Sequence, residues 1–270
     1  MNRNLMTSSK KNVLIIVLAS TVLVSLAAYL FIRSISLTQP GSTTMAGPVK
    51  QTPELARAPE KRIRPATERI LFAGDSMMQG VAPLLMRELK ATHPDWLLRN
   101  ESQQSTGLIV KRRLDWVEKI KQEIVQYRLT TVVVFLGPND PWDIYERKQV
   151  IRFPSPEWEA LYSARVSEIC EFAKDKKTHL VWIGLPTMKE KRVHRGAVVQ
   201  NPIFRDNMKR YGFDFVSTEA LIGRLDQPYA RHAIDAKGKQ INLRADDGIH
   251  FTSQGLQRIA SAVLTTIDTP

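Results

Sequence analysis

A serine that follows a short apolar run has the setting that a catalytic nucleophile requires. Ser76 lies in the segment GDSMM (74–78), where the apolar run ends and a helical pattern begins. A serine at a helix N-terminus lies among outward-pointing backbone N–H groups, which favour developing negative charge. The alternative is a plain helix cap, because aspartate and serine are both favoured there. Taken alone, the segment favours the cap.

A histidine near the C-terminus is the candidate base. His250 lies in the segment DDGIHF (246–251), just before the last helical pattern. Histidine exchanges a proton near neutral pH. Asp247, three residues earlier, could fix the tautomer of the ring through a hydrogen bond across a tight turn. In isolation the segment favours an ordinary surface-loop histidine.

Two further loops offer hydrogen-bond donors for an oxyanion. Asn139, in GPND (137–140), carries a side-chain amide that can donate, although a Pro-Asn pair is also common in turns. Gly107 follows Ser105 and Thr106, and a glycine lets the backbone approach a ligand closely. The glycine carries little weight by itself.

Alternating strands and helices must position these four segments. Nearly continuous apolar or β-branched runs predict buried strands over 69–73, 131–136 and 179–185, and weaker ones over 96–99 and 213–216. Apolar residues at helical spacing predict helices over 77–89, 117–127, 158–173 and 256–267. The alternation predicts a three-layer α/β/α sandwich with a mostly parallel, flavodoxin-like sheet, whose sites lie at the carboxyl ends of the strands.

The four segments in this order resemble the SGNH (GDSL-like) hydrolase superfamily over about residues 68–268. The matching blocks are Gly74-Asp75-Ser76, Gly107, Gly137-x-Asn139-Asp140 and Asp247-x-x-His250. Within the superfamily, GDSMMQGVAPLL and DGIHFTSQG look like segments of membrane-anchored bacterial periplasmic members. Pro138, before Asn139, is a variation on the third block that leaves the side-chain donor in place.

The resemblance implies ester chemistry without a metal or organic cofactor. Ser76 would be the nucleophile, His250 its base and Asp247 the residue that orients His250. The backbone N–H groups of Ser76 and Gly107, with the side chain of Asn139, would form the oxyanion hole. Asp75 would brace the turn rather than react.

The resemblance also suggests a substrate class: a carbohydrate O-acyl ester, O-acetyl in particular, on a glycan of the cell envelope. Hydrolysis and transfer share an acyl-enzyme and differ in whether water or a sugar hydroxyl attacks it, so the sequence leaves both open. A membrane-bound acyltransferase would be a partner in the transfer case. The alternatives are a lipid or thioester hydrolase and a non-catalytic protein that binds glycans or serves as a scaffold in a membrane complex.

Two side chains are candidates for substrate binding. Trp142 follows the third block, and Arg192 lies in residues 186–212, which interrupt the alternation of strands and helices and are rich in basic residues. Loops at this edge of a sheet often form the substrate wall. We therefore expect an aromatic that stacks on sugar and a basic wall, the alternative being a solvated basic loop.

The first 67 residues indicate an anchor and a tether. Residues 13–32 are twenty residues without a charge, enough to span roughly 30 Å of hydrocarbon. Basic residues precede this stretch more than they follow it, which predicts a cytoplasmic segment 1–12, an inner-membrane anchor 13–32 and a periplasmic domain. A cleaved signal peptide is the alternative. Residues 33–67 contain five prolines and no apolar period, so we expect a linker and then one domain over 68–270.

The net charge of +12 is concentrated in that N-terminal part. Residues 1–67 hold nine of the 39 Lys/Arg and two of the 27 Asp/Glu, which leaves 30 and 25 for residues 68–270. The domain is therefore only mildly basic, and it lacks the basic stripe with interleaved aromatics that nucleic-acid binding favours. The single cysteine, Cys170, excludes an intramolecular disulfide.

Overall fold

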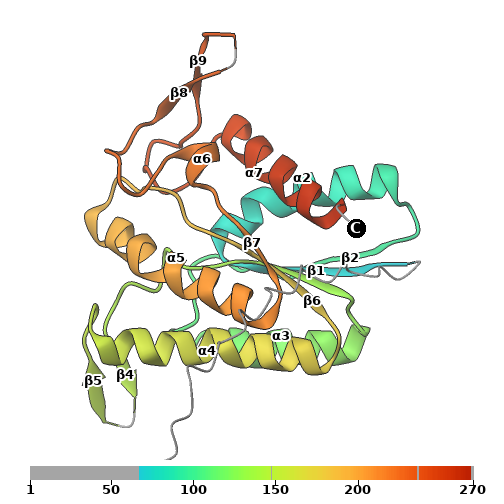
Figure 1. The fold of residues 1–270 in the computed structure, drawn as a ribbon, viewed down its shortest axis with the longest axis vertical. Helices are drawn as coiled ribbons and strands as arrows, with labels where there is room; N and C mark the ends of the chain where they lie inside the picture. The colour runs from blue at the N-terminus through green and yellow to red at the C-terminus, as the bar shows by residue number, and fades with distance from the viewer. Residues whose placement is uncertain (1–66, 147, 236, 269–270) are drawn as a thin grey trace, which may run out of the picture. The chain divides into compact units, whose positions relative to one another are not determined.

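A computed structural model describes residues 67–268, except residues 147 and 236. Its centre is a five-stranded parallel sheet with the order β2-β1-β3-β6-β7 (Figure 1). The strands are β1 (Arg69–Gly74), β2 (Leu97–Asn100), β3 (Thr131–Phe135), β6 (His179–Ile183) and β7 (Asp214–Val216). All five predicted strands are present, and their order is the flavodoxin-like one.

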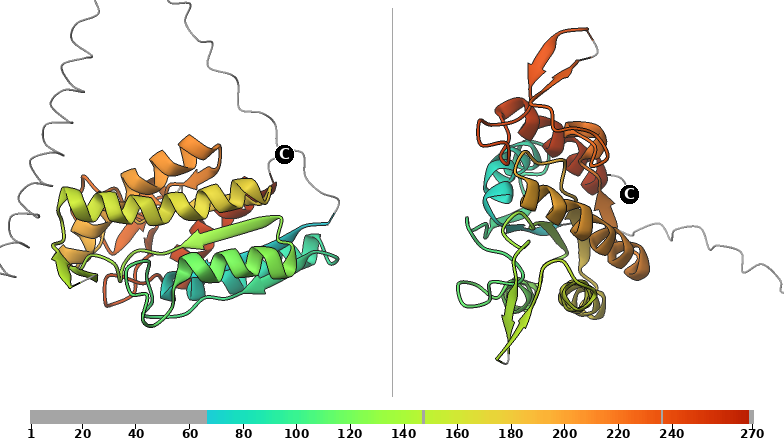
Figure 2. Two further views of the ribbon diagram at one scale, coloured as in Figure 1. Left: turned by 90° about the horizontal axis from the view of Figure 1, so that it is seen from below. Right: turned by 90° about the vertical axis from the view of Figure 1, so that its left-hand side faces the viewer.

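Helices cover both faces of this sheet, which confirms the predicted three layers. α2 (Ser76–Thr92) and α7 (Ser253–Asp268) lie side by side on one face (Figures 1 and 2). The other face carries α3 (Trp116–Tyr127), α4 (Pro156–Asp175) and α5 (Lys191–Tyr211). Strands between two helical layers have no solvent face, and every residue of β3 is accordingly buried.

The expectation of an irregular segment over 186–212 is wrong for most of its length. Residues 191–211 form α5, which starts at the N-cap Glu190 and ends at Gly212 in the left-handed conformation. Its buried face includes the polar residues Gln200 and Asn201, whose amides bond the backbone of Gly137 and Leu185 at the ends of β3 and β6. These buried amides interrupt the apolar period from which a helix is predicted.

Two hairpins and a short helix have no counterpart among the elements predicted from the sequence. β4 (Ile144–Glu146) pairs with β5 (Gln149–Ile151), and β8 (His232–Ile234) pairs with β9 (Gln240–Asn242), both antiparallel. α6 (Glu219–Ile222) is one turn long. Strands of three residues are too short to show an alternating pattern.

The predicted cytoplasmic segment 1–12, the anchor 13–32 and all of the linker except Thr67 lie outside the described residues. Among the helices of residues 67–268, none is both long and apolar enough to cross a bilayer.

Candidate active site

The first and last loops of the sheet bring Ser76 and His250 together. Ser76 is the first residue of α2, directly after β1, and His250 lies just before α7. Because α2 and α7 are neighbours on one face, the two side chains meet, and the imidazole Nε2 of His250 lies 2.7 Å from Ser76 Oγ. On the other side of the ring, Nδ1 lies 2.6 Å from Asp247 Oδ2. The three predicted residues thus form one chain of hydrogen bonds.

Asp247 is held as an ionised acceptor. Partial burial raises its pKa, but hydrogen bonds from the His250 ring and from the backbone N–H groups of His250 and Ile249 outweigh this and lower the pKa to about 2. An ionised Asp247 accepts a hydrogen bond from the Nδ1–H of His250, and in this tautomer Nε2 is the acceptor for the hydroxyl of Ser76. The side chains of Asp247 and His250 are 47% and 42% exposed, so this side of the site opens to solvent.

Asp75, rather than Ser76, caps helix α2. Its buried carboxylate accepts a hydrogen bond of 2.8 Å from the backbone N–H of Met77. Burial, together with the nearby charge of Asp140, raises its pKa to about 7 against the hydrogen bonds that lower it. Because the cap is filled by its neighbour, the hydroxyl of Ser76 is free to bond His250, and the plain-cap interpretation of Ser76 is not what the structure shows.

The predicted oxyanion donors Gly107 and Asn139 lie on two loops that contact each other. Asn139 Nδ2 donates to the carbonyl of Thr106 at 2.9 Å and makes a long contact of 3.4 Å with Asp75 Oδ2. A Cβ on Gly107 would lie 2.1 Å from Asp140 Oδ1, so only glycine fits against that carboxyl. The structure thus places Asn139 against Asp75, next to Ser76, and Gly107 against Asp140. The role of both residues toward an oxyanion stays a prediction.

Asp140 ties these two loops together, a role that the sequence analysis did not assign. Its buried carboxyl accepts from the backbone N–H of Ile109 at 3.1 Å and from the hydroxyl of Tyr162 at 2.8 Å. Burial raises the pKa of Asp140 to about 6, although hydrogen bonds and Arg165 lower it. Arg165 donates to the carbonyl of Leu108 at 2.9 Å. In the sequence, Tyr162 reads only as part of the apolar face of a helix.

A buried arginine, also missed, supports the loop of His250. Arg244 Nη1 donates to the carbonyl of Thr187 at 2.7 Å, and Nη2 donates to those of Gly248 at 3.0 Å and Ile249 at 2.8 Å. Its Nε lies 3.3 Å from the carbonyl of His250 itself. Burial lowers the pKa of Arg244 to about 10, which leaves it charged at neutral pH. An arginine in a polar segment gives no sequence signal for this role.

The predicted substrate-binding residues Trp142 and Arg192 lie against each other. The guanidinium carbon of Arg192 is 4.4 Å from the centroid of the Trp142 ring, and Arg192 Nη1 donates to the carbonyl of Pro141 at 3.3 Å. Arg192 comes from the first turn of α5 rather than from a loop. Trp142 is 54% exposed. Contact of either side chain with a substrate stays a prediction.

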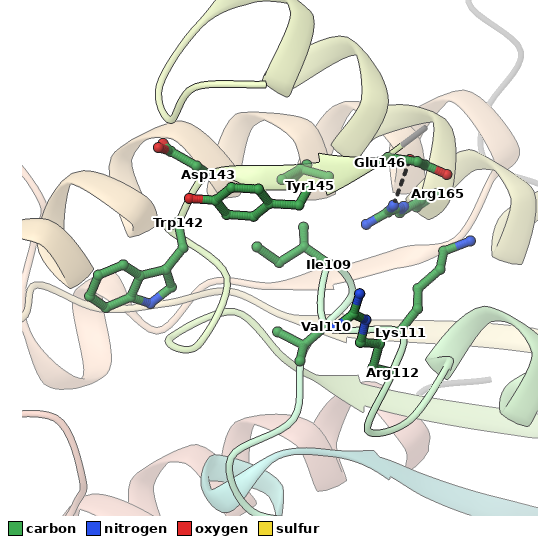
Figure 3. Close-up of a pocket in the computed structure, with 10 residues that line it drawn as sticks. Ile109, Val110, Lys111, Arg112, Trp142, Asp143, Tyr145, Glu146 and Arg165 are labelled. Atoms are coloured by element: carbon green, nitrogen blue, oxygen red, sulfur yellow. Dashed lines mark hydrogen bonds and ion pairs between the residues drawn. The ribbon is translucent and has the colours of Figure 1, made fainter. Parts of the chain in front are cut away.

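Beside the third block lies a pocket of about 540 Å³ (Figure 3). It is formed by residues 109–112, by residues 142–146 and by Arg165. The first segment begins two residues after Gly107 and the second three residues after Asn139. The pocket is thus continuous in the chain with both predicted oxyanion loops.

Comparison with known sequences finds one protein family. The model of DUF459, described as a protein family of unknown function, matches residues 69–266. Among curated proteins, none matches the chain.

Several solved structures share the fold at low sequence identity. A catalytic mutant of Axe2, an acetylxylan esterase from Geobacillus stearothermophilus, is 15% identical over 75% of this chain and 95% of its own, with a TM-score of 0.54. TesA is 15% identical over 74% of this chain and 98% of its own, with a TM-score of 0.51. The psychrotrophic esterase EstA from Pseudoalteromonas sp. is 15% identical over 74% and 96%, with a TM-score of 0.50.

At this identity the solved structures establish the fold and leave the reaction open. Their fold is the one that the order of the serine, glycine, asparagine and Asp-x-x-His blocks predicts. Because the DUF459 model matches residues 69–266 of the 270, the chain belongs to the DUF459 family.

Proposed function

We propose that this protein is a serine-dependent carbohydrate O-acyl esterase or transferase, acting on O-acetyl groups in particular, with a glycan of the cell envelope as its substrate. The observation that carries the proposal is the unbroken chain of hydrogen bonds from Ser76 through His250 to Asp247. A nucleophile, a base and a residue that orients the base are the parts that acyl transfer through a serine requires.

In the proposed reaction, Ser76 Oγ attacks the carbonyl carbon of the ester while His250 Nε2 accepts the hydroxyl proton. The tetrahedral intermediate collapses when His250 returns that proton to the sugar oxygen, which leaves as an alcohol. The acyl group stays on Ser76. Water or a second sugar hydroxyl then gives its proton to His250 and attacks the acyl-enzyme, and the proton finally returns to Ser76. Asp247 stabilises the imidazolium in both halves of the cycle.

The oxyanion of each intermediate would lie between the Ser76 turn and the loops of Gly107 and Asn139. The backbone N–H of Ser76, at the start of α2, would donate to it, because helix N-termini stabilise negative charge. Each well-placed donor contributes about 3–4 kcal/mol to the transition state in comparable sites. The long contact between Asn139 Nδ2 and Asp75 is weak, so an oxyanion could compete for that donor.

Three observations support a glycan as substrate. The fold neighbour Axe2 is named as an acetylxylan esterase, and this chain presents an exposed tryptophan, Trp142, just after the third block. The open side of the site, at His250 and Asp247, leaves room for a bulky polymer. An aromatic face suits the apolar face of a sugar ring.

The proposal includes the cellular location. Residues 13–32 would anchor the chain in the inner membrane, with residues 1–12 in the cytoplasm and the domain in the periplasm, where it could work beside a membrane-bound acyltransferase. The test is protease digestion of spheroplasts that carry the full chain with a C-terminal epitope. Loss of the epitope without lysis supports this topology, and protection until lysis contradicts it.

The activity is tested with the full chain in mild detergent on p-nitrophenyl acetate and on acetylated xylooligosaccharides, with and without an unacetylated acceptor. Release of acetate that disappears in Ser76→Ala is expected, as is a covalent fluorophosphonate adduct at Ser76. If wild type and Ser76→Ala release acetate equally, the enzymatic proposal fails. Acetyl groups on the acceptor would identify a transferase. Rates that rise with acyl chain length would favour the lipid or thioester hydrolase instead.

A further inference from the structure

The pocket next to the oxyanion loops has a distinctive lining. Figure 3 shows Tyr145 of β4 along one side and Val110, Lys111 and Arg112 along the other, with Ile109 between them. Trp142 lies at one end and the Arg165–Glu146 ion pair at the opposite end. The pocket therefore combines exposed aromatic rings and basic side chains with the aliphatic residues Ile109 and Val110.

This pocket adjoins the loop that carries the predicted oxyanion donor Gly107. The carboxyl of Asp140 accepts a hydrogen bond from the backbone N–H of Ile109 and lies where a Cβ on Gly107 would be. One side of the pocket and the predicted oxyanion loop therefore pack against the same carboxyl. Two residues of chain span at most about 7 Å. A ligand in the pocket would thus lie beside the Gly107 loop, and Ser76 itself does not line the pocket.

The acidic side chains of the pocket already have cationic partners. Glu146 pairs with Arg165 at 3.3 Å, and Asp143 pairs with Arg152 at 2.6 Å. Lys111 has a looser contact of 3.5 Å with Asp115. Among residues 67–268 as described, Arg112 has no ion-pair partner. The unmatched charge that lines the pocket is therefore positive.

The exposed rings are the second element of the pocket. Tyr145 is 77% exposed and Trp142 is 54% exposed, although aromatic rings of this size usually lose contact with water on folding. The guanidinium of Arg192 lies on the Trp142 ring and extends the positive charge along the same edge. A flat ring beside a cation suits a ligand that has both an apolar face and an anionic group.

We propose that this pocket binds a carboxylate- or phosphate-bearing sugar that neighbours the acylated sugar in the same polymer. Arg112 and Lys111 bind the anionic group, and Tyr145 stacks on the ring. The statement that the acylated sugar lies at Ser76 rests on the proposed function, whereas binding of the anionic sugar in the pocket does not. The substrate class becomes an acidic glycan rather than a neutral one.

Binding is tested with the full chain in mild detergent by calorimetry, using hexagalacturonate as the carboxylate probe, a phosphorylated dextran oligosaccharide as the phosphate probe and xylohexaose as the neutral probe. At least one anionic probe is expected to bind about tenfold more tightly than xylohexaose. Raising the salt from low to high concentration should remove most of this preference, because charges near the surface are screened. The anionic probe that binds with the lower dissociation constant shows whether the pocket prefers a carboxylate or a phosphate. Equal affinities for all three probes overturn the proposal.

Matched variants locate the site. Arg112→Gln is expected to raise the dissociation constant of the preferred anionic probe about tenfold, whereas Arg113→Gln, next to it in the chain but not a pocket residue, should change it less than about twofold. Tyr145→Ala should weaken every probe about fivefold, and Val150→Ala, its cross-strand partner, should not. If Arg112→Gln and Arg113→Gln behave alike, the anion binds elsewhere and the assignment to this pocket is wrong.

Kinetics separate this inference from the proposed function. With acetylated oligosaccharides, Arg112→Gln should raise KM for the anionic glycan several-fold more than for the neutral one, because it removes binding shared by ground state and transition state. If the chain binds anionic glycan through Arg112 but shows no Ser76-dependent activity, the pocket assignment stands and the proposed esterase function is wrong. If the chain is active but Arg112→Gln changes KM equally for both glycans, the proposed esterase function stands and the pocket assignment is wrong.

Discussion

Buried charges of opposite sign support the two halves of the site. On the Ser76 side, the carboxyl groups of Asp75 and Asp140 accept hydrogen bonds from the chain, including the backbone N–H groups of Met77 and Ile109. On the His250 side, the guanidinium of Arg244 donates to backbone carbonyls. One half is organised around buried acceptors and the other around a buried donor.

The difference teaches how irregular loops can be held rigid without pairing as strands. A buried charged group is costly unless its hydrogen bonds are satisfied, and each of these groups is satisfied only while its loop keeps one conformation. The two sides differ in their response to pH. Burial raises the pKa of Asp75 to about 7 and of Asp140 to about 6, whereas Arg244, with a pKa of about 10, stays charged throughout the neutral range.

The largest effect is expected at the exposed part of the His250 side. His250→Ala should lower kcat/KM for p-nitrophenyl acetate by about 10⁴-fold, because the base is lost. The midpoint of thermal unfolding should change little, since the His250 side chain is 42% exposed. Steady-state kinetics and a thermal melt check both points. If the variant keeps a tenth or more of the wild-type kcat/KM, His250 is not the catalytic base.

Removing the buried cation should damage both stability and rate. Arg244→Met leaves the carbonyls of Thr187, Gly248 and Ile249 without their donor, and we expect a loss of about 3 kcal/mol in the free energy of unfolding. The rate should also fall, about tenfold or more in kcat, because the His250 loop is no longer held in position. Denaturant unfolding and kinetics at a temperature where the variant is folded separate the two effects.

Arg258→Met is the matched control for this prediction. Among the residues that the structure describes, the Arg258 side chain donates to the carbonyl of Leu221 and has no hydrogen bond to the loop of His250. It should keep the wild-type kcat. An Arg244→Met chain that is destabilised but has the kcat of Arg258→Met would show that Arg244 supports the fold and not the catalytic geometry.

The smallest effect concerns the pH dependence on the Ser76 side. The pKa of Asp140 rises from the ordinary value of 3.8 to about 6 in the folded chain. The folded chain therefore binds this proton more tightly than the unfolded chain does. The stability from Asp140 is therefore complete below about pH 4 and is lost as the pH rises to about 6. Asp140→Asn cannot titrate, so its free energy of unfolding should fall less over this range, by up to about 3 kcal/mol.

Denaturant unfolding at a series of pH values from 4 to 8 measures this difference. Asp206→Asn, at an exposed carboxylate on α5, is the control and should follow the wild-type curve. The contribution of Asp247 to stability changes with pH in the opposite direction from that of Asp140. Because its pKa is lowered to about 2, this contribution is present above about pH 4 and is lost as the pH falls toward 2. Wild-type and Asp140→Asn curves of equal slope would show that Asp140 does not titrate in this range.

The sheet and the three residues that meet at its edge could be predicted because their signals are local. The run TVVVF identifies β3 as a buried strand, and Asp-x-x-His places the carboxylate and the ring in one turn. Each of these patterns lies within a few residues. The order of the blocks along the chain then fixes which loops meet, since parallel strands end at the same edge.

The supports could not be predicted because each joins residues that are distant in the chain. Tyr162 lies 22 positions from Asp140, and Arg244 lies 57 positions from Thr187. Each side chain has an ordinary interpretation, as an apolar helix face or a surface arginine. α5 was missed for a related reason: Gln200 and Asn201 look polar enough to face water, but they lie buried against strand ends.

The 174 positions between Ser76 and His250 also have a consequence for biosynthesis. Ser76 leaves the ribosome among the first residues of the domain, whereas its base comes from the loop before the last helix. Contacts at such long sequence separation form late, because the intervening chain must close a large loop. In a partly made or partly folded chain Ser76 therefore lacks its partner His250, and the proposed acyl chemistry would begin only when α7 has packed against α2.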